Sequence, residues 1–164
     1  EQTVKFMLAG AFSYNNRANR LQGQNGTVMP GGVMRDLKQY YLDFILKYRG
    51  FAFYTDFMGR ICNNPLFASN SDLFVYTGKG VNIQTSYIFK KNWEIAIRNS
   101  VLLPSEEVQP LAGYKYYNQS TVALTKYLIG HNLKVQADAS YNHKAQALQP
   151  YNRWQLRFVV EAGI

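Results

Sequence analysis

The sequence contains little that catalysis or metal binding would require. Among its 164 residues there is one cysteine, Cys62, and there are two histidines. A single cysteine excludes both an intrachain disulfide framework and a thiolate metal cluster. Glycine-rich phosphate loops, nucleophile elbows and HExxH zinc motifs are absent. We therefore expect a protein that is not an enzyme, without catalytic residues, cofactor or metal.

Charge and long apolar runs are also scarce. Charged residues make up 17% of the chain, against about 25% in typical soluble domains. No segment approaches the roughly 18 consecutive apolar residues of a membrane-spanning helix. The composition also excludes a disordered chain. With 47% hydrophobic and 15% aromatic residues, the sequence has much apolar surface that must be covered. The length predicts one domain, residues 1–164.

The chain is basic, with 18 Lys and Arg against 10 Asp and Glu and a net charge of +8. Nucleic acid is a common partner of basic proteins, but such proteins cluster their cations in a patch. Here the Lys and Arg residues are spread over every segment, so we expect no nucleic-acid partner. The sequence shows no charged-then-apolar leader, and a strand pattern begins at Val4. We therefore expect a secretory signal to be either absent or already removed, and further chain to precede Glu1.

Eight segments alternate apolar and polar residues with a period of two, which is the pattern of a β-strand with two different faces. They are residues 4–15, 37–48, 50–60, 80–89, 93–101, 120–129, 133–142 and 152–164. Their connections alternate in length, with tight turns at 48–50, 90–92 and 130–132 and long polar loops between the other strands. This alternation is typical of an antiparallel transmembrane β-barrel, with short periplasmic turns and long extracellular loops.

A soluble β-barrel or sandwich, such as a lipocalin-like barrel around an apolar ligand, is the alternative fold. The apolar face carries aromatic residues at the segment ends, as an interfacial girdle in a membrane does. These candidate lipid-interface residues are Tyr14, Tyr40, Tyr48, Phe51, Phe89, Trp93 and Trp154. Lys126 also falls on the apolar face, close enough to Gly130 for its amine to reach the interface. The pattern favours the membrane barrel.

The polar face would then line the lumen. Its candidate cations are Lys5, Arg17, Lys47, Arg60, Lys90, Arg98, Lys134, Arg153 and Arg157, and its anions are Asp43, Asp56, Glu94, Asp138 and Glu161. We expect most of these charges to pair across neighbouring strands. The cationic surplus would attract anions, and we predict Arg98 and Arg157 as anion contacts that lack a carboxylate partner.

Three hairpins carry a resemblance to a known family. They are KYRGF at residues 47–51, KKNWEIA at 90–96 and GHNLKVQ at 130–136. Together with the segments around them, in family order over nearly the whole chain, they resemble the phosphate-selective porin O and P family in its Bacteroidetes form. The resemblance implies a bacterial outer-membrane porin, usually a homotrimer, whose barrel has sixteen strands.

The resemblance matches this chain to the C-terminal half of that barrel. The family's constriction loop and much of its basic ladder lie in the other half, so phosphate selectivity is not carried over. The segment from Trp154 resembles the terminal insertion signal, although it ends in Ile164 where an aromatic residue is common. Eight strands closed on themselves would leave no pore, and open edges are not tolerated in lipid. Either the chain is part of a longer protein or a partner supplies the other half of the barrel, and we expect the first.

The sequence thus predicts a channel for passive diffusion of small anionic solutes, phosphate among them, or small polar solutes. The expected partners are outer-membrane lipid and small anions. The alternative is a structural β-barrel subunit or anchor within a larger envelope complex, with conductance incidental.

Overall fold

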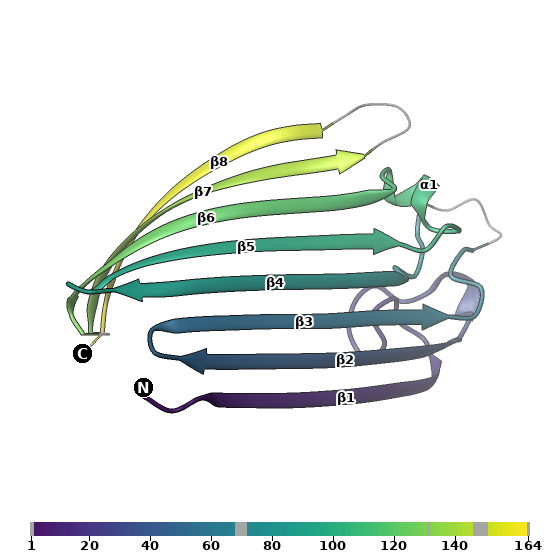
Figure 1. Cartoon of the computed structure of the whole chain (residues 1–164). Coiled ribbons are helices and arrows are strands. Elements are labelled where there is room, and N and C mark those ends of the chain that lie inside the picture. Colours follow the sequence, from purple (N-terminus) through teal and green to yellow (C-terminus); the bar gives the residue numbers. More distant parts are fainter. Residues whose placement is uncertain (1, 68–71, 131, 146–150, 164) are drawn as a thin grey trace.

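The chain forms one antiparallel sheet of eight strands, which follow one another in space in the order of the sequence (Figure 1). The computed structural model describes residues 2–67, 72–130, 132–145 and 151–163. The strands are β1 (Lys5–Ala18), β2 (Arg35–Tyr48), β3 (Phe51–Cys62), β4 (Gly78–Phe89), β5 (Trp93–Pro104), β6 (Tyr116–Ile129), β7 (Leu133–Ala145) and β8 (Tyr151–Ala162). Two short helices, η1 (Pro30–Gly32) and α1 (Gln109–Ala112), lie in the long loops. The predicted all-β class and the eight strands are confirmed.

Several strands run further into the long loops than the alternation predicted. β6 begins at Tyr116 rather than near residue 120, and its first residues pair with the end of β7, as in Tyr117 opposite Lys144. Polar side chains occupy both faces at this end, which hides the period of two. Backbone pairing continues there because the neighbouring strand remains within hydrogen-bond reach.

The turn after β2 shows how the short connections are built. Arg49 and Gly50 both have positive φ, 46° and 83°, which is the conformation of a type I′ hairpin turn. The Gly50 carbonyl oxygen accepts a hydrogen bond from the Ile88 amide at 2.9 Å, so the turn lies against β4. A Cβ on residue 50 would stand 2.9 Å from the carbonyl oxygen of Ile88. The close approach and the positive φ therefore both require glycine at this position.

The strand register keeps the two faces separate across the whole sheet. On one face, which we call the outer face, Leu42, Phe57, Val81 and Val101 stand opposite one another on successive strands. On the other, the inner face, the residues between them are mostly polar, such as Asn82 opposite Ser100. A shift of one residue in any pairing would mix the two sets. The register is therefore the means by which this sequence sorts its side chains.

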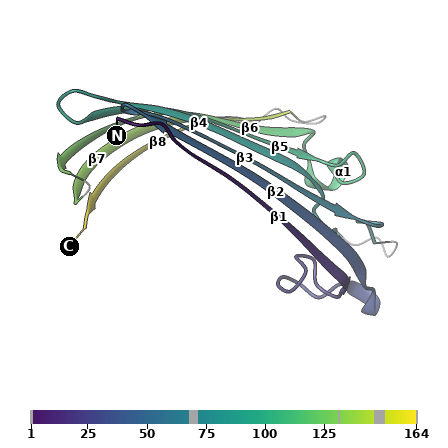
Figure 2. The ribbon, with the colours of Figure 1, turned by 60° about the horizontal axis from the view of Figure 1, so that its bottom comes forward.

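The sheet is curved (Figure 2), and exposure differs between its faces. Thr121, on the inner face of β6, is 6% exposed, whereas its outer-face neighbour Val122 is 54% exposed. On β4 the inner Ser86 is 8% exposed and the outer Tyr87 is 45% exposed. The concave side of a curved sheet crowds its side chains, and here the crowded side is polar. The more exposed side of the sheet is therefore the apolar one.

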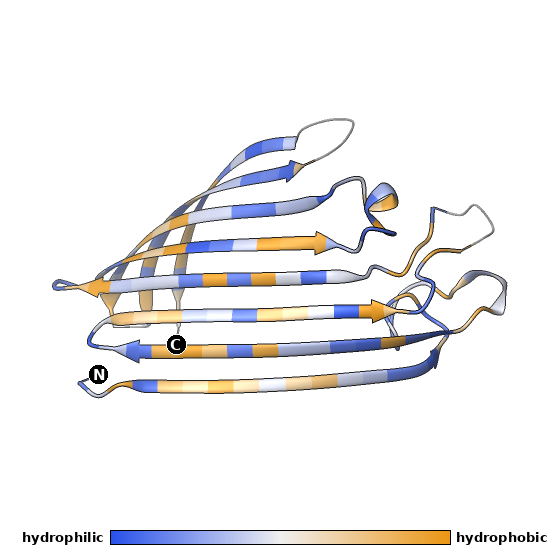
Figure 3. Cartoon of the chain, turned by 45° about the vertical axis from the view of Figure 1, so that its right-hand side comes forward, coloured by the Kyte–Doolittle hydropathy of each residue, from blue (hydrophilic) through white to orange (hydrophobic). Residues whose placement is uncertain are grey.

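The apolar band of the outer face runs obliquely to the cross-strand rows. Leu8 lies in the middle of the apolar stretch of β1, yet the row that contains it ends on β8 at Trp154, the first large apolar residue of that strand. The same row holds Asn99 and Ser120 on β5 and β6. In Figure 3 the loop-side halves of β7 and β8 are accordingly hydrophilic. The apolar band therefore crosses the strands at an angle and does not follow a single row.

Gly59 provides the space for an aromatic side chain on the outer face. It stands opposite Tyr40, and a Cβ on residue 59 would lie 2.1 Å from Cζ of the Tyr40 ring. We predict that Gly59→Ala displaces this ring and destabilises the sheet by about 1–3 kcal/mol. Urea unfolding of the variant measures the change. The double variant Gly59→Ala/Tyr40→Ala should recover part of the loss, and equal loss in both variants would contradict the role of the ring.

The first two long loops fold onto the inner face. Leu37 and Cys62 form an inner-face pair at the loop end of β2 and β3. A small apolar core surrounds Leu37, with Met29 from the first loop and Val75 from the second, both buried. These loops therefore cover part of the inner face at the end of the sheet where the long loops lie. We call this end the mouth.

The sheet is not closed. β1 and β8 are its two edges, and each pairs on one side only within the described residues. Closure into a barrel is thus not observed in this chain. No helix among the described residues has the length and apolarity to span a membrane.

Candidate functional site

The inner face is organised in cross-strand rows, set by the strand register. Of the inner-face rows that cross all eight strands, the one nearest the mouth is the apolar row, with Ala11, Tyr41, Met58, Gly80, Leu102, Tyr117, Lys144 and Tyr151. The amide row follows, with Ala9, Asp43, Asp56, Asn82, Ser100, Gln119, Asn142 and Arg153. The arginine row comes next, with Met7, Ile45, Tyr54, Gln84, Arg98, Thr121, Ser140 and Gln155. The fourth row contains Lys5, Lys47, Ala52, Ser86, Ala96, Ala123, Asp138 and Arg157.

Hydrogen bonds run along the amide row from strand to strand. The Ser100 hydroxyl donates to Asn82 Oδ1 at 2.8 Å, and Asn82 Nδ2 donates to Asp56 Oδ2 at 2.9 Å. Further along, Gln119 Nε2 donates to Asn142 Oδ1 at 2.8 Å. These bonds hold the polar side chains against the sheet. They also give hydrogen-bond partners to polar groups that the curvature of the sheet brings close together.

Arg98 lies in the recess that the fourth row leaves open. This cavity, of about 240 Å³, has Ala96 and Ala123 in its lining, and these two alanines face each other across β5 and β6. Arg98 Nη2 donates to Gln119 Oε1 at 3.2 Å, while its buried Nε has no hydrogen-bond partner. Among the described residues no carboxylate lies within ion-pair distance of Arg98. Glu94 and Asp138 also line this cavity, but Glu94 accepts a hydrogen bond from the Tyr127 hydroxyl and Asp138 is paired with Arg157. The terminal nitrogens of Arg98 are therefore the donors that a small anion in the recess would contact.

Arg157 does not behave as the sequence predicted. Its Nε donates to Asp138 Oδ2 at 2.9 Å, and the Asp138 side chain is almost fully buried. The prediction that Arg157 lacks a carboxylate partner is therefore wrong. The alternation of residues along a strand assigns each residue to a face, but it does not give the register between strands, and the register brings Asp138 opposite Arg157. Lys134 is paired too, with Glu161 at 3.0 Å.

The Arg157–Asp138 pair gives a prediction about stability. Arg157→Ala would leave the buried Asp138 carboxylate with only the 3.2 Å hydrogen bond from Gln136. Since Arg157 is itself half exposed, we expect a loss of about 1–3 kcal/mol rather than the larger cost of a fully buried pair. Unfolding in urea measures it. Asp138→Asn/Arg157→Ala should be closer to wild type than Arg157→Ala, and the opposite order would contradict the pairing.

The other predicted cations occupy different places on the sheet. Register places Lys5, Lys47, Arg60 and Arg153 on the inner face, with Arg153 over the Tyr151 ring at 4.6 Å. Lys90 lies in the turn after β4.

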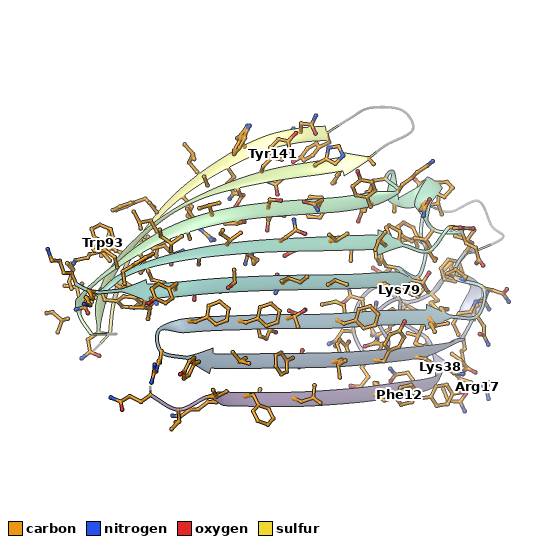
Figure 4. All side chains as sticks on the ribbon, viewed as in Figure 1. Phe12, Arg17, Lys38, Lys79, Trp93 and Tyr141 are labelled. Carbon is orange, nitrogen blue, oxygen red and sulfur yellow. The ribbon has the colours of Figure 1, made fainter. Side chains whose placement is uncertain are left out.

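Arg17 lies in a β-bulge of β1 with φ of 53°, so strict alternation does not extend to it. Its amide donates to Asp36 Oδ1 at 2.8 Å. In Figure 4 its side chain lies at the mouth end of the sheet, as that of Lys38 does.

The predicted interface aromatics all lie on the outer face. Near the short turns, Tyr48 stands opposite Phe51, and Phe89 opposite Trp93. Tyr14, Tyr40 and Trp154 lie nearer the mouth, with Trp154 against Tyr141 at a ring distance of 5.0 Å. Figure 4 shows Trp93 at the end opposite the mouth.

Lys126 is the one cation among the apolar outer residues of β6. Its amine lies 5.1 Å from the centre of the Trp93 ring and donates to the Lys91 carbonyl oxygen in the turn at 2.6 Å. The side chain therefore bends toward the end of the strand, as a lysine at a membrane interface does.

Sequence reasoning missed the apolar row and the tyrosines around it. Lys144 lies about 5.0 Å from the ring centres of both Tyr114 and Tyr151. The hydroxyls of Tyr114 and Tyr76 are hydrogen-bonded at 2.8 Å, and burial together with this bond raises the pKa of Tyr76. Both tyrosines come from long loops, where no periodic pattern exists to place them.

Comparison of the chain with protein-family models, curated proteins and solved structures finds no match in any of the three.

Proposed function

We propose that this chain forms part of the wall of a porin-like channel in a bacterial outer membrane, through which small anionic or polar solutes diffuse passively. One observation carries the proposal. The strand register places most exposed apolar residues on one face and most crowded polar residues on the other, over strands of 12 to 14 residues. Lipid on one side and water on the other account for both faces at once.

The charges of the inner face support anions as the favoured solutes. Asp138 and Glu161 are neutralised by Arg157 and Lys134. Arg98 has no carboxylate within ion-pair distance among the described residues, and its recess opens on the same face. A cation at a water-filled wall raises the local concentration of anions and lowers that of cations.

The two open edges support a wall completed by further strands. Unpaired backbone groups along β1 and β8 would be costly in lipid. In our proposal the rest of a longer polypeptide supplies these strands, giving one barrel of about sixteen strands that assembles as a trimer. This is the arrangement that the resemblance to the phosphate-selective porin O and P family implies.

Reconstitution in planar bilayers tests the function. The full-length polypeptide that carries this chain should give stepwise conductance, with a reversal potential in a KCl gradient that indicates preference for chloride over potassium. Cation preference would contradict the role of the inner cations. Purification in mild detergent as a stoichiometric hetero-complex without conductance would favour the alternative, a structural subunit of an envelope complex.

A further inference from the structure

The apolar row stands apart from the rest of the inner face. Tyr41, Met58, Gly80 and Leu102 follow one another directly on β2, β3, β4 and β5. Met58 is 43% exposed on this otherwise polar side. An apolar strip on a wall that faces water costs free energy unless something covers it.

A cavity lies over this strip. A Cβ on residue 80 would lie 3.0 Å from Met58 Cγ and 3.5 Å from Leu102 Cδ1, so these two side chains close over the glycine and form the apolar floor. The cavity measures about 380 Å³, and the phenol rings of Tyr41 and Tyr76 form part of its lining. Its size and apolar lining are those of sites for small organic molecules.

Arg60 supplies a cation in the lining of the same cavity. The Gln39 amide satisfies both of its neighbours when its oxygen faces Arg60. In that orientation the oxygen accepts from Arg60 Nε at 3.2 Å and from Nη2 at 3.1 Å, and the nitrogen donates to the Tyr41 hydroxyl at 2.7 Å. These bonds orient the guanidinium, and among the described residues no carboxylate lies within ion-pair distance of it. Because a guanidinium has five N–H donors, others remain for a ligand.

We propose that the cavity between Tyr41, Met58 and Leu102 binds a small organic carboxylate, its apolar ring or chain over Gly80 and its carboxylate on Arg60. This inference rests on the proposed function in one respect, since solutes reach the cavity through the water-filled inner side. An inorganic anion has no apolar part to bury, and a neutral sugar has no charge for Arg60. The apolar walls and the oriented guanidinium of Arg60 select a molecule that carries both features.

Equilibrium binding of benzoate to the purified full-length protein in detergent tests the site, with acetate as the ligand that lacks the ring. Benzoate should bind at least about tenfold more tightly than acetate. Arg60→Gln, which removes the charge, and Gly80→Val, which pushes Met58 and Leu102 into the cavity, should each weaken benzoate binding by about tenfold or more. Lys38→Gln removes a cation from the outer face beside Gln39 and should leave binding unchanged.

The outcomes separate this site from the channel. Absence of benzoate binding to the wild type, equal affinity for acetate, or unchanged binding in both variants would overturn the proposal that the cavity binds an organic carboxylate. Benzoate binding that both variants weaken, in a protein without conductance, would support the cavity and contradict the channel alone. Thermal unfolding of Arg60→Gln should coincide with wild type, which shows that its lost binding reflects the cavity and not a loss of folded protein.

Discussion

Ile97→Lys should destabilise the protein in lipid by about 2–4 kcal/mol, the cost of a cation near the middle of a membrane-facing strand. Ile97 lies on the outer face of β5 and is 52% exposed. At such an exposed position a soluble protein would tolerate lysine within about 0.5 kcal/mol. The same substitution therefore has very different expected effects under the two interpretations of the apolar face. Urea unfolding of the full-length protein in lipid vesicles measures the difference.

A matched control comes from the inner face. Gln136→Lys introduces the same charge on β7, where Gln136 contacts Asp138. We expect little loss there, because the new cation would face water and a carboxylate. If Ile97→Lys were neutral, or if Gln136→Lys cost as much, the assignment of the outer face to lipid would be contradicted.

Arg98→Glu should lower the preference of the channel for anions. The substitution changes the charge at one point of the inner wall by two units. For an ion that passes at roughly 7 Å in water, the electrostatic energy of the ion changes by about 1 kcal/mol. This corresponds to a change of about fivefold in its local concentration. Reversal potentials in a KCl gradient measure the change in the ratio of chloride to potassium permeability. Arg98→Gln should give about half of the shift.

The control for this prediction changes the same charge outside the lumen. Lys79 lies on the outer face near the mouth and is exposed (Figure 4). Lys79→Glu alters the net charge as much as Arg98→Glu does, yet it should leave the permeability ratio nearly unchanged. Equal shifts in the two variants would show that selectivity follows the net charge of the protein and not the inner wall.

The strands and their two faces could be predicted from the sequence, because a period of two survives in segments such as that of β5 from Trp93. The placement of Lys126 near a tight turn followed from the same reasoning. What parity cannot supply is the partner of each residue across the sheet. It could not show that Asp138 stands opposite Arg157, or that Gly80 separates Met58 from Leu102.

The parts outside the alternation were beyond prediction for another reason. The bulge at Arg17 inserts an extra residue into β1 and ends the parity there. The loops that bring Met29 and Val75 onto Leu37 are held by contacts between distant segments, and no local pattern records such contacts. Closure of the barrel likewise depends on strands that would pair with the open edges of β1 and β8.

Labelling of single cysteines along β6 tests the central claim most directly, namely that the apolar face lies in lipid and the polar face in water. Cysteine at position 123, on the inner face, and at positions 122 and 124, on the outer face, would be introduced into a Cys62→Ser background of the full-length protein in outer membranes. A hydrophilic maleimide should label position 123 and leave 122 and 124 unlabelled. Labelling of 122 and 124 with protection of 123, or equal labelling of all three, would contradict the account.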